Sequence, residues 1–184
     1  MFSVELCAGF QSNPKLSHFK AVKMIFRYLK GTPNIGLWYL KSKNFELIIY
    51  ADANFARCGI DIKGTYEICQ LLGRTLVSWP SKKQNSVALF IAEVEYIAVG
   101  ACCAQVIWMK NTLENYVIHL KDIYVKCDNT SVICLIKNPI QHSRTKHIVI
   151  RHHFIRDYIN NHDICLEFIN IKYQLADYFY KTFK

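Results

Sequence analysis

Four acidic side chains lie beside apolar stretches of the chain, where carboxylates are uncommon. They are Asp52, Glu95, Asp128 and Asp177. Asp52 and Asp128 each follow directly on a stretch with strand character. Glu95 lies in the first turns of an apolar helical stretch, and Asp177 lies in a C-terminal helical stretch. Carboxylate oxygens are hard ligands that suit Mg²⁺ or Mn²⁺, and burying several of them together at one sheet edge is costly without cations.

Each of these acids also has an ordinary structural explanation. An aspartate at a strand end is commonly a turn or capping residue, and this holds for Asp128 viewed alone. A glutamate near a helix start complements the helix dipole, which fits Glu93 as well as Glu95. The set as a whole favours metal binding, because two ions held about 4 Å apart stabilise both the attacking water and the leaving oxygen in phosphodiester hydrolysis.

The elements that would position these acids begin with a helix and a group of short strands. Ser17 is a candidate cap for a helix that runs to about Lys30, with Gly31 just past its end. Short stretches rich in β-forming residues follow, separated by polar residues or by glycine and proline. These candidate strands span residues 36–40, 45–53, 65–72 and 75–79. Their close spacing predicts an antiparallel meander.

The hydrophobic period changes after the basic, polar connection at 82–86. Residues 92–115 are typical of a long helix that is apolar on nearly every side and hence buried between layers. The elements expected after it are a strand at 122–127, a helix at 129–137, a basic helix at 144–161, a strand at 164–169 and a last helix from Tyr173 to the end. This order predicts an α/β or α+β fold, with a sheet of mixed direction covered by helices.

The charge of the chain indicates a polyanionic partner. The formal net charge is +9 and the pI is about 9.1, which favours nucleic acid or an anionic membrane surface. Lys20, Lys23, Arg27 and Lys30 form a stripe on the first helix that is either a solvated face or a phosphate-facing one. The longest uncharged apolar stretch, 96–109, is too short to span a bilayer, so we expect no membrane-spanning segment.

The eight cysteines do not follow a metal-binding or disulfide pattern. None lies in a C-x-x-C pair, and most occupy apolar runs in which cysteine behaves as a small buried hydrophobe. The chain begins without a secretory signal, so we expect a reduced, intracellular protein of the cytoplasm or nucleus. The histidines His142, His147, His152 and His153 have no cysteine or acid at ligand spacing, which disfavours a zinc site.

Five segments of the chain form long motifs in a fixed order. They are HFKAVKMIFRYLKGTPNIGLWY (18–39), LGRTLVSWPSKKQNSVAL (72–89), CDNTSV (127–132), HSRTKHIVIRHHFIRDYI (142–159) and QLADYFYKTF (174–183). Together they resemble the end of plant copia-type retrotransposon polyproteins. The resemblance implies a ribonuclease H-like fold, a five-stranded mixed sheet flanked by helices with an N-terminal helical arm. Residues 1–40 would be the tail of the polymerase region, and residues 41–184 the ribonuclease H-like domain.

The resemblance also implies an activity, which is hydrolysis of the RNA strand of RNA–DNA hybrids with two Mg²⁺ or Mn²⁺ ions. The Asp-Glu-Asp-Asp set of the family falls on Asp52 in YADANFA, Glu95 in AEVEY, Asp128 in KCDN and Asp177 in QLADYF. In that scheme Asp52 bridges both metals, while Glu95 and Asp128 hold the ion on the leaving-group side. Asp177 completes the ion that generates hydroxide from water.

The partners follow from the same resemblance. The resemblance implies an RNA–DNA hybrid as substrate, rather than a membrane or a small molecule, and a polymerase domain within the same longer polyprotein. Basic residues of the connection at 82–83 and of the segment 144–151 are expected to contact the nucleic-acid backbone. These residues are Lys82, Lys83, Arg144, Lys146, His147 and Arg151.

Several positions depart from the family pattern and leave a second hypothesis open. Phe90 and Ile91 stand where the family has a Ser-Thr pair, so the helix that carries Glu95 lacks a capping hydroxyl, a loss of about 1 kcal/mol. Glu67 replaces a glycine of a turn. Other replacements are Asn54, Val149 and Tyr180. The alternative to an active ribonuclease H is therefore a catalytically weak or inactive remnant that acts at most as a basic nucleic-acid-binding module.

Overall fold

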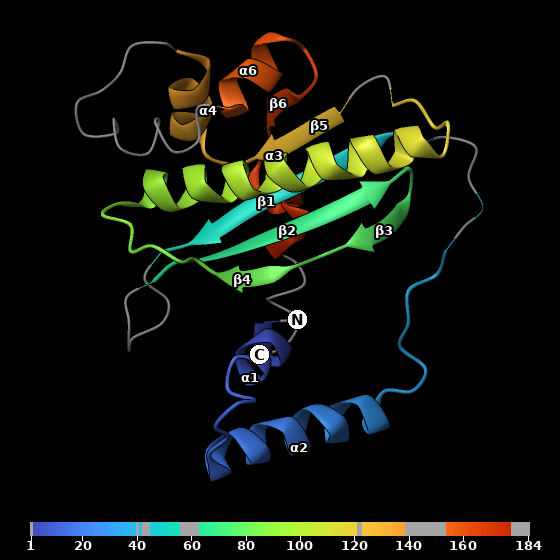
Figure 1. The fold of residues 1–184 in the computed structure, drawn as a ribbon, viewed down its shortest axis with the longest axis vertical. Coiled ribbons are helices and arrows are strands. Elements are labelled where there is room, and N and C mark those ends of the chain that lie inside the picture. Colours follow the sequence, from blue (N-terminus) through green and yellow to red (C-terminus); the bar gives the residue numbers. More distant parts are fainter. Residues whose placement is uncertain are drawn as a thin grey trace.

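The computed structural model describes residues 2–39, 41, 45–55, 63–120, 123–138 and 154–177. Its centre is a six-stranded sheet with the order β3-β2-β1-β5-β6, in which β4 pairs with β2 (Figure 1). The strands are β1 (Leu47–Asn54), β2 (Thr65–Leu72), β3 (Thr75–Ser78), β4 (Ser81–Lys83), β5 (Ile123–Cys127) and β6 (Cys165–Phe168). β1, β2 and β3 run antiparallel and β1, β5 and β6 run parallel, which confirms the predicted mixed sheet.

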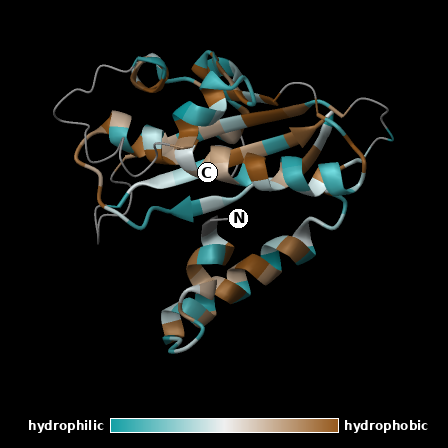
Figure 2. Ribbon diagram, turned by 45° about the horizontal axis from the view of Figure 1, so that its top comes forward, coloured by the Kyte–Doolittle hydropathy of each residue, from teal (hydrophilic) through white to brown (hydrophobic). Residues whose placement is uncertain are grey.

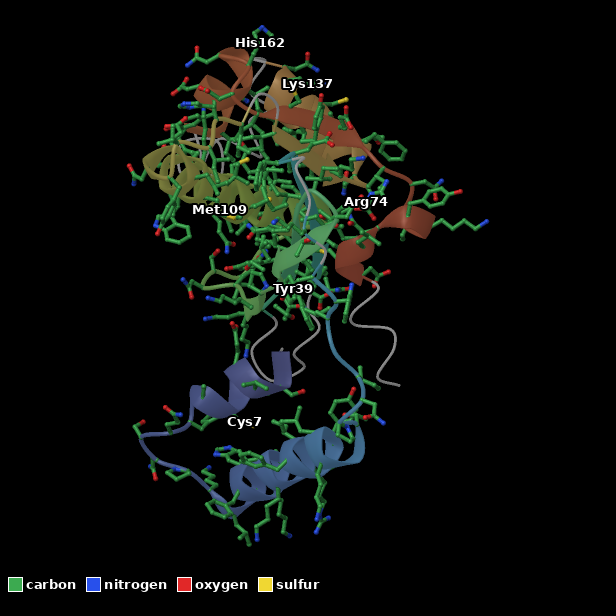
Figure 3. The ribbon with its side chains drawn as sticks, turned by 90° about the vertical axis from the view of Figure 1, so that its right-hand side faces the viewer. Cys7, Tyr39, Arg74, Met109, Lys137 and His162 are labelled. Carbon is green, nitrogen blue, oxygen red and sulfur yellow. The ribbon has the colours of Figure 1, made fainter. Side chains whose placement is uncertain are left out.

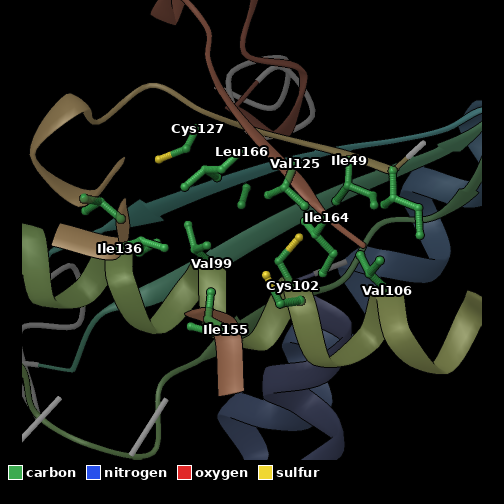
Figure 4. Close-up of a cluster of buried hydrophobic side chains, with 14 of the residues drawn as sticks. Ile49, Val99, Cys102, Val106, Val125, Cys127, Ile136, Ile155, Ile164 and Leu166 are labelled. Atoms are coloured by element: carbon green, nitrogen blue, oxygen red, sulfur yellow. The ribbon is translucent and has the colours of Figure 1, made fainter. Parts of the chain in front are cut away.

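Helix α3 (Ile91–Asn115) crosses one face of the sheet and forms the main core with it (Figure 1). The core joins Val99 and Cys102 of the helix to Ile49 of β1 and Val125 of β5 (Figure 4). Length and composition alone would let α3 cross a membrane, but more than half of its most apolar window is buried inside this fold. The buried helix expected from its nearly uniform hydrophobicity is therefore confirmed.

Two further helices cover the same face of the sheet. α4 (Thr130–Lys137) begins after β5, and the Asn129 side chain caps it by accepting hydrogen bonds of 3.0 and 3.3 Å from two backbone N–H groups of its first turn. α6 (Phe154–Asn160) packs against α4, and Arg156 donates a hydrogen bond of 3.0 Å to the Leu135 carbonyl near the end of α4. The strand β6 then returns to the sheet, as the sequence predicts.

The strands β3 and β4 share one position at the edge of the sheet. β3 pairs with residues 70–72 of β2, and β4 pairs with residues 65–67. Pro80 lies between them and has no N–H to donate, although its carbonyl accepts a hydrogen bond of 3.0 Å from the Ile68 N–H. The expected five strands thus correspond to the five positions across the sheet. The prediction of a connection at 82–86 is wrong at its start, because β4 pairs with β2 after Pro80 and includes residues 82 and 83.

Helices α1 (Phe2–Ala8) and α2 (Leu16–Gly31) form an N-terminal arm outside the layers of the sheet (Figure 1). Seen from the side, α1 with Cys7 lies between α2 and the sheet (Figure 3). α1 contacts the edge strand β4, and Lys82 Nζ lies 3.9 Å from Glu5 Oε1. No residue of α2 is buried, and hydrophobic and hydrophilic residues are interspersed along this helix (Figure 2).

The boundaries of α2 differ from those expected. Lys15 is the N-cap and the helix begins at Leu16, so Ser17 lies inside the first turn. The earlier start is stabilised by His18, whose Nδ1 accepts a hydrogen bond of 3.1 Å from the Lys15 N–H. Gly31 is the last helical residue rather than the first residue beyond the helix.

Two other expected elements are wrong or only partly visible. Residues 36–39 form no strand, because no strand among the described residues pairs with this segment, which leads from α2 to the sheet (Figure 1). In place of a helix from Tyr173, a 3-10 turn η2 (Ile171–Tyr173) precedes helical residues at 175–177. The Asn170 side chain favours that turn by accepting a hydrogen bond of 3.0 Å from the Lys172 N–H. The remainder of this predicted helix lies outside the described residues.

Candidate metal centre

Asp52 and Asp128 lie at the same end of two neighbouring strands. In the parallel pairing of β1 with β5, Ala51 lies opposite Cys127, so the residues that follow them along the chain are adjacent. Asp52 is 9% exposed, and its Oδ1 accepts a hydrogen bond of 2.8 Å from the Ala53 N–H. Asp128 lies just beyond β5 and is partly buried. The register therefore brings together the two strand-end acids that the sequence singles out.

Glu95 comes from the first turns of α3, which the loop before the helix holds in place. The Gln84 side-chain amide donates a hydrogen bond of 2.8 Å to the Val94 carbonyl, and the Gln84 N–H donates one of 2.8 Å to the Gly64 carbonyl. A Cβ at Gly64 would lie 2.7 Å from Val94 Cγ1, so this close approach of backbone to helix requires glycine. The Glu95 side chain is 6% exposed.

Asp177 reaches the site on a C-terminal segment that Gln174 anchors. The buried Gln174 amide donates a hydrogen bond of 3.0 Å to the Ala51 carbonyl, immediately before Asp52. The same side chain hydrogen-bonds Asp128. The charge of Asp177 acts on both Asp52 and Asp128 and raises the pKa of each. The structure thus brings all four predicted acids into one cluster.

Burial and mutual repulsion raise the pKa values in this cluster. Burial, followed by repulsion from Asp128 and Asp177, raises the pKa of Asp52 to about 7. Burial, followed by repulsion from Asp52 and Asp128, raises the pKa of Glu95 to about 9. Burial also raises the pKa of Asp128, although the hydrogen bond from Gln174 lowers it. Among the described residues, no lysine or arginine forms an ion pair with Asp52, Glu95 or Asp128.

Two oxygen atoms in the cluster have no hydrogen-bond partner within the described parts of the chain. They are Glu95 Oε2 and Asp128 Oδ1, and both are buried. A buried carboxylate oxygen without a donor is costly, and a bound cation would satisfy it. One ligand atom from each of Glu95, Cys127 and Asp128 lies within 4.8 Å of the other two. The residues present therefore fit a divalent cation with oxygen ligands, as the sequence predicts.

Glu67 is a fifth carboxylate that sequence reasoning does not place in this cluster. It lies directly opposite Asp52 in the pairing of β1 with β2 and is buried. Its Oε1 accepts a hydrogen bond of 3.4 Å from Ser81 Oγ, and its charge contributes to the raised pKa of Asp52. The sequence presents Glu67 as a replaced glycine in a turn, which is wrong because residue 67 lies within β2. Gln174 and Cys127 are two further neighbours of the site. Both lie in segments that resemble the family, but the sequence alone gives neither a functional role.

The start of α3 confirms the predicted loss of a side-chain cap. Phe90 is the N-cap, and its side chain accepts no hydrogen bond. Glu93 compensates in part, because its Oε2 accepts a hydrogen bond of 2.7 Å from the Leu89 N–H. The helix still presents Glu95 to the cluster, since the burial of several large side chains along α3 outweighs a cap of about 1 kcal/mol.

The residues expected to bind nucleic acid fall into two groups. Lys82 and Lys83 lie on the edge strand β4, where Lys82 is exposed and Lys83 is partly buried. Because Lys82 faces Glu5, this edge is shared with the N-terminal arm. The other four, Arg144, Lys146, His147 and Arg151, lie outside the described residues, as does the first part of the predicted basic helix.

Solved structures of RNase H domains share the fold of this chain. LC11-RNase H1, isolated from compost, has a TM-score of 0.55 and 14% identity over 73% of this chain and 91% of its own. The N-terminal RNase H domain of a Mycobacterium tuberculosis protein has a TM-score of 0.53 and 12% identity, over 73% of this chain and 89% of its own. At these identities the likeness establishes the fold alone.

Relatives in sequence come from plant transposons. The retrovirus-related Pol polyprotein from transposon RE1 of Arabidopsis thaliana is 34% identical over 177 residues, which is 96% of this chain. The corresponding polyprotein from transposon TNT 1-94 of Nicotiana tabacum is 36% identical over 162 residues, or 88% of this chain. This chain spans 12% of the length of each of these relatives. No protein-family model matches the sequence.

The mixed sheet, its helices and these structural neighbours give the chain a ribonuclease H-like fold. The relatives in sequence identify the family of the chain more narrowly than the fold does. The chain is homologous to a segment of the retrovirus-related Pol polyproteins of plant transposons.

Proposed function

We propose that this chain is the ribonuclease H of a copia-type Pol polyprotein and that it hydrolyses the RNA strand of RNA–DNA hybrids with two Mg²⁺ or Mn²⁺ ions. The observation that carries this proposal is the convergence of Asp52, Glu95, Asp128 and Asp177 from four separate segments. Strongly raised pKa values and buried oxygens without donors are typical of acids arranged for function rather than for stability.

The charges around Asp52 support its role as the ligand shared by both ions. The charges of Asp128 and Asp177 raise the pKa of Asp52, and the charge of Asp52 raises the pKa of Glu95, so Asp52 interacts electrostatically with each of the other three. Glu95 and Asp128 have neighbouring oxygens that would hold one ion, and Asp177 would complete the second. When bound, the two ions would stabilise the attacking water and the leaving oxygen of the phosphodiester.

The wider setting is part of the same proposal. The net charge of +9 supports a nucleic-acid backbone as partner, rather than a membrane or a small molecule. The exposed hydrophobic residues of α2 support the assignment of residues 1–40 to the tail of a polymerase region and of 41–184 to the nuclease domain. The polymerase domain would then belong to the same polyprotein, and the whole would act inside the cell.

A cleavage assay with matched variants tests the activity. The purified full chain is incubated with a hybrid labelled on its RNA strand, in Mg²⁺ and in excess EDTA. Glu95→Gln removes a proposed ligand, and Glu114→Gln removes the same charge from an exposed position on the same helix. We expect Asp52→Asn and Glu95→Gln to lose at least about 100-fold in rate, since loss of an outer-shell partner alone costs 10- to 100-fold. Cleavage by Asp52→Asn at the rate of Glu114→Gln would contradict the proposal.

The uncapped start of α3 favours a second candidate function. A catalytically weak or inactive remnant would bind hybrids through its basic surface without cleaving them. In that case a gel-shift assay detects binding, while cleavage does not exceed that of Asp52→Asn. Phe90→Ser restores the capping side chain ahead of Glu95, so a gain of cleavage in this variant would assign the weakness to that position.

A further inference from the structure

The thiol of Cys127, a neighbour of the four acids, plays no part in the proposed hydrolysis. Cys127 ends β5, immediately before Asp128, and its side chain is fully buried. A ligand atom from each of Glu95, Cys127 and Asp128 lies within 4.8 Å of the other two. Magnesium and manganese favour oxygen ligands and gain little from sulfur, so the thiol is unused in the reaction proposed above.

The surroundings hold these three groups ready for a ligand. Cys127 is fixed by its neighbour, since its Sγ accepts a hydrogen bond of 3.4 Å from the Asn129 N–H. Glu95 is fixed by the first turns of α3, and its 6% exposure leaves it almost fully buried. Glu95 Oε2 is buried and has no hydrogen-bond partner among the described residues. A buried acceptor of this kind indicates that a cation belongs beside it.

We propose that Glu95, Cys127 and Asp128 form a site for one thiophilic divalent cation, of the class of Zn²⁺ or Cd²⁺. Such ions accept thiolate and carboxylate ligands together, commonly at four-coordinate sites in which water can complete the shell. On binding, the Cys127 thiol gives its proton to solvent and its sulfur forms a bond to the ion. Because Glu95 and Asp128 are also proposed magnesium ligands, the thiophilic ion excludes Mg²⁺ and stops cleavage. This inhibitory consequence rests on the proposed function, whereas the binding itself does not.

Titration of the full chain with Cd²⁺ tests the binding, because a cadmium–thiolate bond has a charge-transfer band in the ultraviolet. Cys127→Ser removes the proposed sulfur ligand. Cys134→Ser removes an exposed thiol on α4 and serves as the matched control. We expect the wild type and Cys134→Ser to bind one Cd²⁺ tightly with this band. Cys127→Ser should lose the band of that site and at least about tenfold in affinity. Retention of the band by Cys127→Ser would overturn the proposal.

A second variant covers the case in which Cys127→Ser does not fold, which circular dichroism would detect. Glu95→Gln keeps every thiol, so it should weaken Cd²⁺ binding without removing the band at saturation. Unchanged Cd²⁺ affinity in Glu95→Gln would equally overturn the proposal. In the cleavage assay, Zn²⁺ added to Mg²⁺ should inhibit the wild type more strongly than Cys127→Ser. A chain that binds Cd²⁺ through Cys127 but never cleaves a hybrid would refute the nuclease function and leave the thiophilic site standing.

Discussion

At the scale of single residues, Asp52 concentrates the electrostatic cost of the site. It is buried, it lies opposite Glu67 and beside the acids from β5 and the C-terminal segment, and its pKa rises to about 7. Near neutral pH a large share of Asp52 is therefore protonated in the protein without metal. A divalent cation has to displace that proton, which ties metal binding to pH in the neutral range.

Asp52→Asn should stabilise the metal-free protein at pH 8 and leave it nearly unchanged at pH 4. Asp52 titrates near 3.8 when unfolded and near 7 when folded, so between these values the folded state holds a proton that the unfolded state has lost. The stability that this acid contributes is present below about pH 4 and is lost as the pH rises through 7. We expect a gain of about 1 to 3 kcal/mol at pH 8.

Urea unfolding at both pH values measures this difference, and Glu114→Gln is the control for loss of an exposed charge. Addition of Mg²⁺ at pH 8 should stabilise the wild type and have much less effect on Asp52→Asn. Equal stability of wild type and Asp52→Asn at pH 8 would contradict the raised pKa, because it would mean that ionising Asp52 costs the folded protein no free energy.

Glu67→Gln should lower the pKa of Asp52. The carboxylate of Glu67 lies opposite Asp52 across the β1–β2 pair, and its charge disfavours ionisation of Asp52. The Asp128 and Asp177 charges and the burial stay in place, so the pKa should fall below 7 without returning to its ordinary value. NMR titration of the Asp52 carboxyl measures the change. Glu46→Gln, at an exposed position before β1, should leave it unmoved, and a pKa unaffected by Glu67→Gln would place Glu67 outside the cluster.

These residues also show what the sequence can and cannot predict about a site. Asp52 and Asp128 are found because strand ends are visible in the pattern of apolar residues. Glu67 is not found, because its place opposite Asp52 depends on a strand register that no local pattern specifies. Gln174 is missed for a related reason, since its partner Ala51 is distant in sequence and the hydrogen bond exists only in the folded chain.

At the scale of elements, the C-terminal segment is attached to the sheet mainly through Gln174. The side chain of Gln174 hydrogen-bonds the Ala51 carbonyl of β1 and the Asp128 carboxylate that follows β5, so it links the two strands of the site. Leu175 and Ala176 add a small apolar contact on the sheet face opposite α3. Removing the amide should therefore loosen Asp177 without disturbing the main core.

Gln174→Leu should raise the pKa of Asp128 and lower the stability. The hydrogen bond from Gln174 lowers the pKa of Asp128, so its removal shifts that pKa further upward. The buried Ala51 carbonyl loses its donor, which costs about 1 to 3 kcal/mol of unfolding free energy. Gln105→Leu is the control, because it removes a part-buried amide whose partner is Ser78, away from the acids. An equal rise of the Asp128 pKa in Gln105→Leu would contradict the proposed hydrogen bond from Gln174 as the cause.

At the scale of the whole molecule, sequence patterns predict the layers better than the edges. The buried helix 91–115 and the strands beside it are correctly expected, because the hydrophobic effect acts on long apolar stretches that are visible in one dimension. The strand at 81–83 and the absence of one at 36–39 depend on whether a partner strand lies alongside. That condition is set by the assembled sheet, so short edge elements are where the expectations are wrong.

The N-terminal arm should contribute little to the stability of the sheet. Phe26 on α2 is 66% exposed, whereas Val99 on α3 is fully buried against β1 and β5. We expect Phe26→Ser to change the free energy of unfolding by less than about 0.5 kcal/mol, and Val99→Ala to lower it by about 2 kcal/mol. Phe26→Ser should also reduce any self-association of the chain, because it removes an exposed apolar side chain. Urea unfolding and sedimentation measure the two effects, and a cost for Phe26→Ser equal to that of Val99→Ala would mean that α2 packs against the core in solution.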